Sequence, residues 1–535
     1  MPRFHDRSMQ SMPPWPPDTF ALCAHALHRA SAYARVLTNW PPPLYRKHPE
    51  RWANDARTVS QEWLQAIYDE SPLPPATGKL WKTIESGLDL PLSSISKPRS
   101  PVGRILLELL AIADEACSPL IETPEWSAAE FRGKGMGPAM AARRFDSEAK
   151  GILQSNGRRS LCKEIHPSRL RVLPKFRTPQ RGLTVRSLSL YAGLAEASEL
   201  DSRFFNNRQV REGLTLNLLV IPWPFEVRPA QFRSSDALPD EMANMPEDFG
   251  FFTFDGAPAG RGFFSAISSL LKKAEKECGK ISMVVLPELA LSDAEAAQLC
   301  RLLEEHECGL VAGVGKSGGS SSKDHGSNRV QLYVPGLAPM DQNKHHRWRL
   351  DRAQIIQYSL GNLLHHEKLW WEHINVADRS LSFLRLMPWL TLCVLICEDL
   401  ARPDPAGDVV RALGPNLVIS LLMDGPQLVG RWASRHATTL ADDPGSSVLT
   451  VTSLGMTKLS HPASGPSRDR VIALWKEEGV SSIEIDLPPD HHAVVLAVSM
   501  KGCRDWAADG RGRKASVPSL TGVRYLQAPG LDTRQ

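Results

Sequence analysis

The chain has 535 residues, a net charge of +4, 42% hydrophobic residues and 23% charged residues. These values are typical of a globular protein and exclude wholesale disorder and fibrous architectures, and the small net charge excludes a global field that would attract nucleic acid or membrane. The length exceeds that of one ordinary core, so we expect two domains or one domain with a sizeable extension. No apolar run is long enough to span a bilayer and the first residues lack a secretion signal, so a cytoplasmic location is expected.

The first 156 residues are predicted to form a mainly helical region. Apolar residues recur at intervals of three and four, and proline-rich joins separate the segments. The segments with this spacing are 20–37, 51–70 and 103–122.

Residues 157–209 are interpreted as a basic connector. Its first part, 157–187, contains nine Lys or Arg residues and a single Glu. One hypothesis is a strip that binds nucleic acid or phosphate. The alternative is a solvated connector between two domains.

Residues 210–500 are predicted to form an α/β domain, because short β-rich apolar runs alternate with helical stretches. The predicted strands lie in 214–223, 281–291, 308–315, 328–336, 390–399, 415–423, 446–455, 481–489 and 492–499, and the predicted helices in 260–278, 292–306, 404–414 and 430–441. Residues 501–535 are polar and are interpreted as a C-terminal tail or an arm that packs elsewhere.

Cys397 is the most informative candidate for a catalytic residue. The nine cysteines show no regular CxxC spacing, which argues against a disulfide framework and a structural zinc site. The segment WLTLCVLICEDLARPDP is an apolar strand that stops at Cys397 before acidic residues, a proline and a helix. A thiol at such a turn is exposed as a nucleophile beside main-chain N–H groups, and the following helix is expected to lower its pKa. Cys393, within the strand, is interpreted as a core thiol.

Two further segments supply partners for this thiol. The strand ISMVVLPELAL carries Glu288 near its end, and QNKHHRWRLD places Lys344 in a polar loop after another strand. A thiol, a carboxylate and an ammonium are suited to acyl transfer: the carboxylate takes the thiol proton and later activates water, and the ammonium stabilises the oxyanion.

These residues resemble the nitrilase, or carbon–nitrogen hydrolase, superfamily, whose triad runs Glu, Lys, Cys in chain order. Glu288, Lys344 and Cys397 fit that order, and Arg402 and Arg435 lie where the family has recurrent arginines. The resemblance implies that Arg435 contacts the substrate. Over about residues 210–500 the resemblance implies a four-layer α-β-β-α sandwich, often a homodimer or larger homo-oligomer. It also implies hydrolysis of small amides, nitriles or ureido compounds through a covalent thioester or thioimidate, with the Glu398 main-chain N–H at the oxyanion. No metal or organic cofactor is expected, and some members pass the acyl group to an amine.

The sequence departs from the family at several places. Many members carry a second glutamate soon after the lysine, where this chain has Gln354. Either Glu367 replaces it from a longer loop or the second glutamate is missing. Arg347 matches a related spacing, but an arginine cannot tune its proton affinity, so Lys344 is kept as the catalytic cation.

The segment HHEKLWWEHINVADRS between the lysine and the cysteine is predicted to form one wall of the substrate pocket. Its histidines and glutamates do not have the His-Glu-x-x-His spacing of a zinc site. Its tryptophans, with Trp371 as the candidate contact, favour an aromatic or nucleobase-like ligand.

Two hypotheses for function remain. The first is a hydrolase of a non-peptide carbon–nitrogen bond. The second is a nitrilase-like module that senses a ligand while the helical region contacts a partner. The apparent lack of a second glutamate and the large N-terminal extension both favour it. A narrower resemblance, to nitrilase-like domains fused to bacterial reverse transcriptases in antiphage defence, implies a defence pathway; the nearest string to a polymerase motif, LADD at 440–443, lacks the tyrosine, so polymerase activity is not predicted.

Overall fold

The computed structural model describes most of the chain. The described residues are 11–35, 45, 47–87, 89–121, 136–155, 157, 159–176, 178–180, 182–196, 200–206, 213–235, 246–256, 258–316, 326–460 and 468–528.

The N-terminal region is helical, as predicted. Its helices are α1 (Pro16–Arg29), α3 (Pro49–Tyr68), α4 (Pro75–Glu85), α5 (Leu92–Ile95), α6 (Pro101–Ala116) and α8 (Met136–Ser155). Helix α6 is central: it packs against α1, α3 and α4, and nearly all of its residues are buried. It begins with a proline in its first turn, and the Ser100 side chain caps it by accepting a hydrogen bond from the Gly103 N–H.

Two seven-stranded mixed sheets form the rest of the core. The first has the strand order β10-β9-β8-β7-β4-β19-β20 and the second β18-β17-β16-β15-β14-β13-β3. The strands of the first sheet are β4 (Thr215–Val220), β7 (Met283–Leu291), β8 (Gly309–Lys316), β9 (Ser327–Tyr333), β10 (Met340–Asn343), β19 (Ala493–Trp506) and β20 (Gly512–Leu526). Those of the second are β3 (Asp201–Asn206), β13 (Ser380–Met387), β14 (Leu390–Ile396), β15 (Leu417–Leu422), β16 (Ser447–Thr452), β17 (Val471–Lys476) and β18 (Ile483–Asp486).

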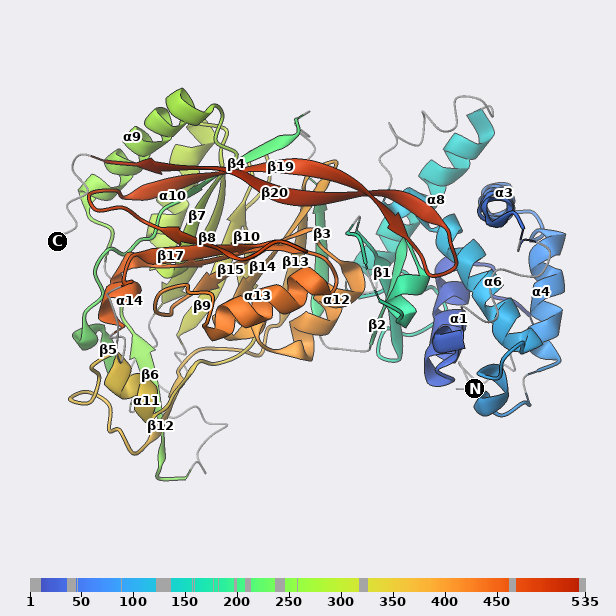
Figure 1. Ribbon diagram of the computed structural model, residues 1–535, viewed down its shortest axis with the longest axis horizontal. Coiled ribbons are helices and arrows are strands. Elements are labelled where there is room, and N and C mark those ends of the chain that lie inside the picture. The colour runs from blue at the N-terminus through green and yellow to red at the C-terminus, as the bar shows by residue number, and fades with distance from the viewer. Residues whose placement is uncertain are drawn as a thin grey trace.

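The two sheets pack face to face between layers of helices (Figure 1). Helices α9 (Arg261–Cys278) and α10 (Asp293–Glu305) cover the first sheet, and α12 (Asp408–Leu413) and α13 (Trp432–Asp442) lie on the side of the second. The central strands are buried along their length, as expected for strands covered on both faces. The predicted α/β fold with four layers is confirmed.

Smaller elements complete the chain. A four-stranded sheet has the order β11-β12-β6-β5, and β1 pairs with β2 in the connector. These strands are β1 (Leu170–Pro174), β2 (Ala192–Glu196), β5 (Phe232–Ser235), β6 (Phe249–Phe254), β11 (Arg349–Leu350) and β12 (Leu369–Glu372). The remaining helical elements are α11 (Arg352–Gln357), α14 (Leu454–Leu459), η1 (Ala32–Arg35), η3 (Ser118–Leu120), η4 (Val185–Leu188), η5 (Pro229–Gln231), η7 (Cys397–Leu400) and η8 (Pro403–Gly407).

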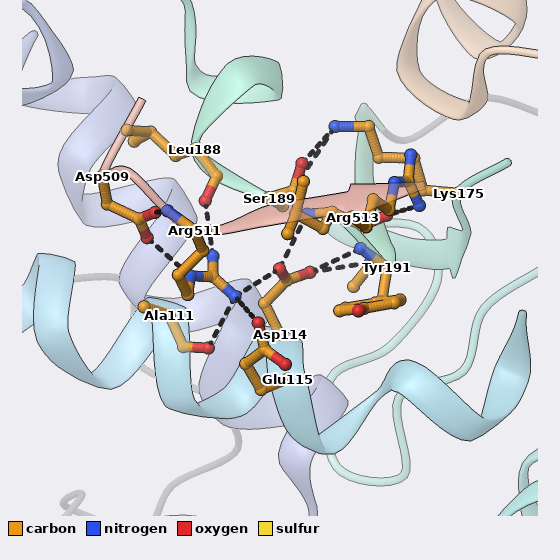
Figure 2. Close-up of polar contacts among 12 residues, drawn as sticks. Ala111, Asp114, Glu115, Lys175, Leu188, Ser189, Tyr191, Asp509, Arg511 and Arg513 are labelled. Atoms are coloured by element: carbon orange, nitrogen blue, oxygen red, sulfur yellow. Dashed lines mark hydrogen bonds and ion pairs between the residues drawn. The ribbon is translucent and has the colours of Figure 1, made fainter. Parts of the chain in front are cut away.

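The hairpin of β19 and β20 extends from the sandwich to the N-terminal helices (Figure 1). Residues 501–526 of the predicted tail or arm belong to this hairpin, and 529–535 lie outside the described residues. Near its tip, Arg511 is fully buried and forms ion pairs with Asp114 and Glu115 of α6 and with Asp509 (Figure 2). Its guanidinium also donates to the Ala111 and Leu188 carbonyls. A buried cation with so many acceptors joins the hairpin to the helical region.

The connector packs into this junction. Lys175 is buried and donates to the Arg186 and Ser189 carbonyls, and the Asp114 carboxylate accepts hydrogen bonds from the main chain of residues 190–192 (Figure 2). Arg171 is also buried and donates to the Leu200 carbonyl. These two basic side chains of 157–187 are therefore internal, and binding of nucleic acid by the others stays a prediction.

No helix within the described ranges combines the length and the apolar character needed to cross a membrane.

Candidate active site

Cys397 lies at a sharp turn between β14 and η7. Its φ is 45°, in the left-handed region that non-glycine residues rarely adopt, and its exposure is 3%. The strand β14 runs parallel to β15, with Ile396 opposite Leu421, so residues 423 and 424 lie beside the cysteine where the two strands end. A strained residue at the end of a buried strand is typical of functional sites.

Glu288 lies on β7 in the facing sheet, where the pairing with β8 is interrupted. The register shifts between Leu286 and Leu291, and Leu289 has a φ of 53°. A Cβ added at Gly313 of β8 would lie 2.4 Å from the Glu288 Cα, so a glycine is required there. The irregular strand turns the Glu288 carboxylate into the buried interior.

Lys344 follows β10, and its main-chain N–H donates to the Asn328 carbonyl of β9 at 2.9 Å. Its ammonium is 1% exposed and lies 2.8 Å from Glu288 Oε1 and 2.7 Å from Glu372 Oε2. The structure therefore brings the predicted carboxylate and ammonium into direct contact. A buried ammonium needs such anionic partners to remain charged.

The second glutamate at Lys344 is Glu372, the last residue of β12. The alternatives considered from the sequence, Glu367 or none, are both wrong: the side chain of Glu367 is 69% exposed and lies in a turn before β12. Glu372 Oε2 also accepts the Trp348 N–H at 3.0 Å, and the Arg347 guanidinium donates to the Glu372 carbonyl. Arg347 thus contributes to holding Glu372, and Lys344 is the buried cation.

The side-chain amide of Asn328 completes this cluster. Its Nδ2 donates to Glu288 Oε1 and to Glu372 Oε1, both at 2.7 Å. Glu288 Oε2 and Asn328 Oδ1 are buried and have no hydrogen-bond partner among the described residues. Buried acceptors of this kind require an explanation, and a proton, a water molecule or a ligand at the site would provide one.

The electrostatics of the site differ from the expectation in one respect. Burial and the Glu288 charge raise the pKa of the Cys397 thiol well above its usual value, although Lys344 opposes them. The expected lowering by the following helix is wrong, because η7 is a short 3₁₀ turn and the site is buried. Burial raises the pKa of Glu288, with Lys344 lowering it and Glu372 raising it further. Burial lowers the pKa of Lys344, but the two glutamates outweigh burial and the pKa ends well above its usual value.

Asp399 connects the cysteine turn with the lysine loop. It is 1% exposed, and its carboxylate accepts hydrogen bonds from the main-chain N–H groups of His345 and His346 and from His346 Nδ1 at 3.0 Å. His345 Nε2 in turn contacts the Ser380 carbonyl. The residue two places after Cys397 therefore fixes the residues that follow Lys344.

Asp424, at the end of β15, lies on another side of Cys397 and contributes to its raised pKa. Its carboxylate accepts hydrogen bonds from the Tyr358 hydroxyl at 2.9 Å, from Arg431 Nη2 at 2.7 Å and from Trp432 Nε1 at 2.9 Å. The predicted substrate contact Arg435 is instead exposed on α13. Arg431 is therefore the arginine of this segment that reaches the ends of the strands.

Trp371, predicted to line the pocket, lies on the face of β12 opposite to Glu372, because side chains alternate along a strand. It packs near the Arg349 guanidinium. Trp370 shares the Glu372 face and is buried in a second apolar cluster. That cluster contains Val227, Phe232, Phe252, Trp348, Leu350, Ile355, Tyr358, Leu360, Leu364, Trp370, Met423, Met456 and Leu459.

Glu398, whose main-chain N–H was predicted to stabilise the oxyanion, follows Cys397 directly in η7. Its side chain is half-buried and pairs with Arg402 at 3.1 Å. Within the described ranges, no group of three or more His, Cys, Asp or Glu residues is arranged to hold a metal ion.

Four residues of the site were not found from the sequence: Glu372, Asn328, Asp424 and Tyr358. Glu372 carried a signal, since LWWE alternates like a strand and places Trp370 and Glu372 on one face. Asn328 and Asp424 are single polar residues at strand ends, which no spacing distinguishes from ordinary turn residues. Tyr358 reaches the site through the tertiary fold alone.

Searches with protein-family profiles and against curated protein sequences gave no match. A comparison with solved structures gave matches to nitrilase-superfamily proteins. The nitrilase-superfamily protein Nit3 of Saccharomyces cerevisiae is 15% identical, with 52% of this chain and 93% of that chain covered and a TM-score of 0.30. An amidase from Nesterenkonia sp. is 13% identical, with 57% and 95% covered and a TM-score of 0.32.

A third structure, the CN-hydrolase superfamily protein XC1258 of Xanthomonas campestris with an arsenic adduct in its active site, is 14% identical, with 60% and 92% covered and a TM-score of 0.29. These three matches cover between 52% and 60% of this chain.

Proposed function

We propose that this protein is a cysteine-dependent hydrolase of a non-peptide carbon–nitrogen bond in a small amide, nitrile or ureido substrate. The observation that carries the proposal is the buried contact of Lys344 with Glu288 and Glu372 beside Cys397. A buried carboxylate, an ammonium and a thiol at one point are the groups that acyl transfer requires.

Glu288 is the general base in this proposal. Its Oε1 accepts from Lys344 and Asn328, while its Oε2 has no partner among the described residues and is available for the thiol proton. A thiol with a raised pKa is protonated at rest, so a base must take its proton during attack. The free carboxylate oxygen meets that need.

For an amide, Cys397 Sγ attacks the carbonyl carbon as its proton passes to Glu288. The oxyanion is stabilised by the Lys344 ammonium and the Glu398 main-chain N–H. Collapse of the intermediate breaks the carbon–nitrogen bond, and Glu288 returns the proton to the leaving amine. Glu288 then takes a proton from water as the water attacks the thioester. The carbon–sulfur bond breaks, the acid leaves, and Glu288 returns the proton to Cys397 Sγ.

The alternative of a ligand-sensing module was favoured by the apparent lack of a second glutamate. Glu372 lies beside Lys344, so the apparent lack of a second glutamate no longer supports a ligand-sensing module. The helical N-terminal region is compatible with either function, and a role in a defence pathway stays a hypothesis from resemblance.

The test is a survey of ammonia release over small amides, nitriles and ureides with the full chain, with Cys397→Ala as the blank. Cys393→Ala is the matched control, because Cys393 is a buried thiol on β14, the strand that leads into Cys397. A thiol-directed amide analogue followed by peptide mass spectrometry should label Cys397. Ammonia release that persists in Cys397→Ala would overturn the assignment.

A further inference from the structure

Asn328 contacts three other residues of the site. Its Nδ2 lies 2.7 Å from a carboxylate oxygen of Glu288 and 2.7 Å from one of Glu372, and its main-chain carbonyl accepts a hydrogen bond from the Lys344 main-chain N–H at 2.9 Å. We propose that Asn328 is a positioning residue that holds the two glutamates around Lys344 and keeps Glu288 in its ionised, basic form. This inference rests on the proposed role of Glu288 as general base.

The chemistry of the side chain fits this role. An amide NH₂ carries two hydrogens on one nitrogen, so a single atom can donate to two acceptors. The orientation of the amide follows from its surroundings, because an amide oxygen in the same place would face two carboxylate oxygens without a hydrogen between them. Asn328 is 1% exposed, so its side chain is shielded from bulk solvent.

The contacts form a closed ring. Glu288 Oε1 and the Glu372 carboxylate each accept from Lys344 on one side and from Asn328 on the other. In this arrangement both hydrogen bonds to Glu288 converge on Oε1, and Oε2 is left without a partner among the described residues. Both oxygens of Glu372 are engaged, with Trp348 N–H as a further donor. Glu288 therefore keeps one carboxylate oxygen without a partner among the described residues, whereas both oxygens of Glu372 accept hydrogen bonds.

The ring also has a charge imbalance. Two buried carboxylates face one ammonium, so the cluster carries one negative charge in excess, which favours uptake of a proton. A neutral amide that donates to both carboxylates favours their ionised forms and adds no charge that would compete with the oxyanion. Loss of this donor should therefore move the protonation of Glu288 to higher pH.

The experiment compares Asn328→Ala and Asn328→Ser with the wild-type chain. The matched control is Asn416→Ala, because Asn416 is also a buried asparagine whose Nδ2 donates two hydrogen bonds, to the Trp389 and Ser516 carbonyls away from the cluster. The first readout is infrared difference spectroscopy of protonated buried carboxyls during a pH titration, with Glu288→Gln to assign the band. The second is the pH profile of kcat/KM on the best substrate.

In Asn328→Ala the carboxyl band should titrate about one pH unit higher than in the wild type, and the acid limb of kcat/KM should move with it. Serine retains one donor, so the carboxyl titration of Asn328→Ser should lie between those of the wild type and Asn328→Ala. Asn328→Ser also provides the test if the alanine variant does not fold. Asn416→Ala should lower the melting temperature without moving either profile.

A carboxyl titration in Asn328→Ser and Asn328→Ala that matches the wild type would overturn the inference. The infrared readout does not depend on turnover. If the wild-type chain releases no ammonia but the carboxyl titration shifts in the Asn328 variants, the proposed hydrolysis is refuted. The role of Asn328 in keeping Glu288 ionised is then still supported.

Discussion

The main-chain N–H of His346 donates a hydrogen bond to the Asp399 carboxylate at 3.1 Å, and this contact ties the loop of Lys344 to the turn of Cys397. Because the acyl-transfer groups lie on two facing sheets, their spacing depends on such cross-links. Asp399→Asn retains the size of the side chain and places an amide NH₂ where two N–H donors converge.

We expect Asp399→Asn to lower kcat by about 10²-fold through misplacement of the Lys344 ammonium, with a smaller change in KM. Steady-state kinetics of ammonia release would measure this. Asp408→Asn, an exposed carboxylate on α12, is the control and should leave both constants unchanged. Equal kcat values in Asp399→Asn and wild type would refute the link.

Glu372→Gln tests the second carboxylate. The substitution retains the volume of the side chain and removes one of the two negative charges beside the Lys344 ammonium. The ammonium should then be held less firmly at the oxyanion, and kcat should fall by about tenfold or more. Glu367→Gln is the matched control, because Glu367 is exposed in the same segment. If Glu367→Gln has the larger effect on ammonia release, the assignment of Glu372 is wrong.

The pH dependence of the reaction should reflect Glu288. Burial raises the pKa of this carboxyl, and the base must be ionised to accept the thiol proton. Activity should therefore be lost as pH falls through the raised pKa, so the acid limb of kcat/KM should lie above the ordinary glutamate value of about 4.3. A limb at the ordinary value would show that Glu288 is not the base.

Arg511→Met tests the junction between the hairpin and the helices. The substitution leaves Asp114, Glu115 and Asp509 buried without their cation, so the free energy of unfolding should fall by about 3–5 kcal/mol. Urea unfolding followed by circular dichroism would measure it. Arg524→Met, which removes an exposed pair with Glu277, should cause little change.

The stability of the same junction should depend on pH through Lys175. Burial lowers the pKa of Lys175 to about 7 in the folded chain, whereas the unfolded chain has the ordinary lysine value of about 10.4. The unfolded state thus binds more protons between these values, and Lys175 makes the free energy of unfolding rise with pH across that window. Urea unfolding between pH 7 and 10 should show a smaller rise in Lys175→Met, and an identical rise would contradict the assignment.

The fold class and the three candidate residues Glu288, Lys344 and Cys397 could be predicted from the sequence, because each depends on a local pattern of residues. Buried parallel strands read as continuous apolar runs, and a strand that stops at Cys397 or continues into Pro287-Glu288 places its polar residue at the sheet's end. These are properties of single segments. The contact of Lys344 with Glu288 then follows from the order of the first sheet, in which β9 and β8 lie between β10 and β7.

The remaining site residues depend on pairings that a sequence does not display. Glu372 reaches Lys344 because β12 joins a small sheet with β6, and the parallel pairing of Leu369 with Phe249 sets its face. Glu367 lies nearer to the lysine in sequence and was considered for that reason. The raised pKa of Cys397 likewise depends on burial by the whole fold, which outweighs the local helix on which the opposite expectation rested.

The hairpin of β19 and β20 determines which fragments of the protein can be expected to fold. A fragment that starts after the connector would retain Arg511 and Arg513 while losing the α6 carboxylates, so two guanidinium groups buried in the full chain would lose partners. We therefore expect that the compositional boundary near residue 157 is not a boundary of independent folding. We expect the helical region and the sandwich to unfold as one cooperative unit.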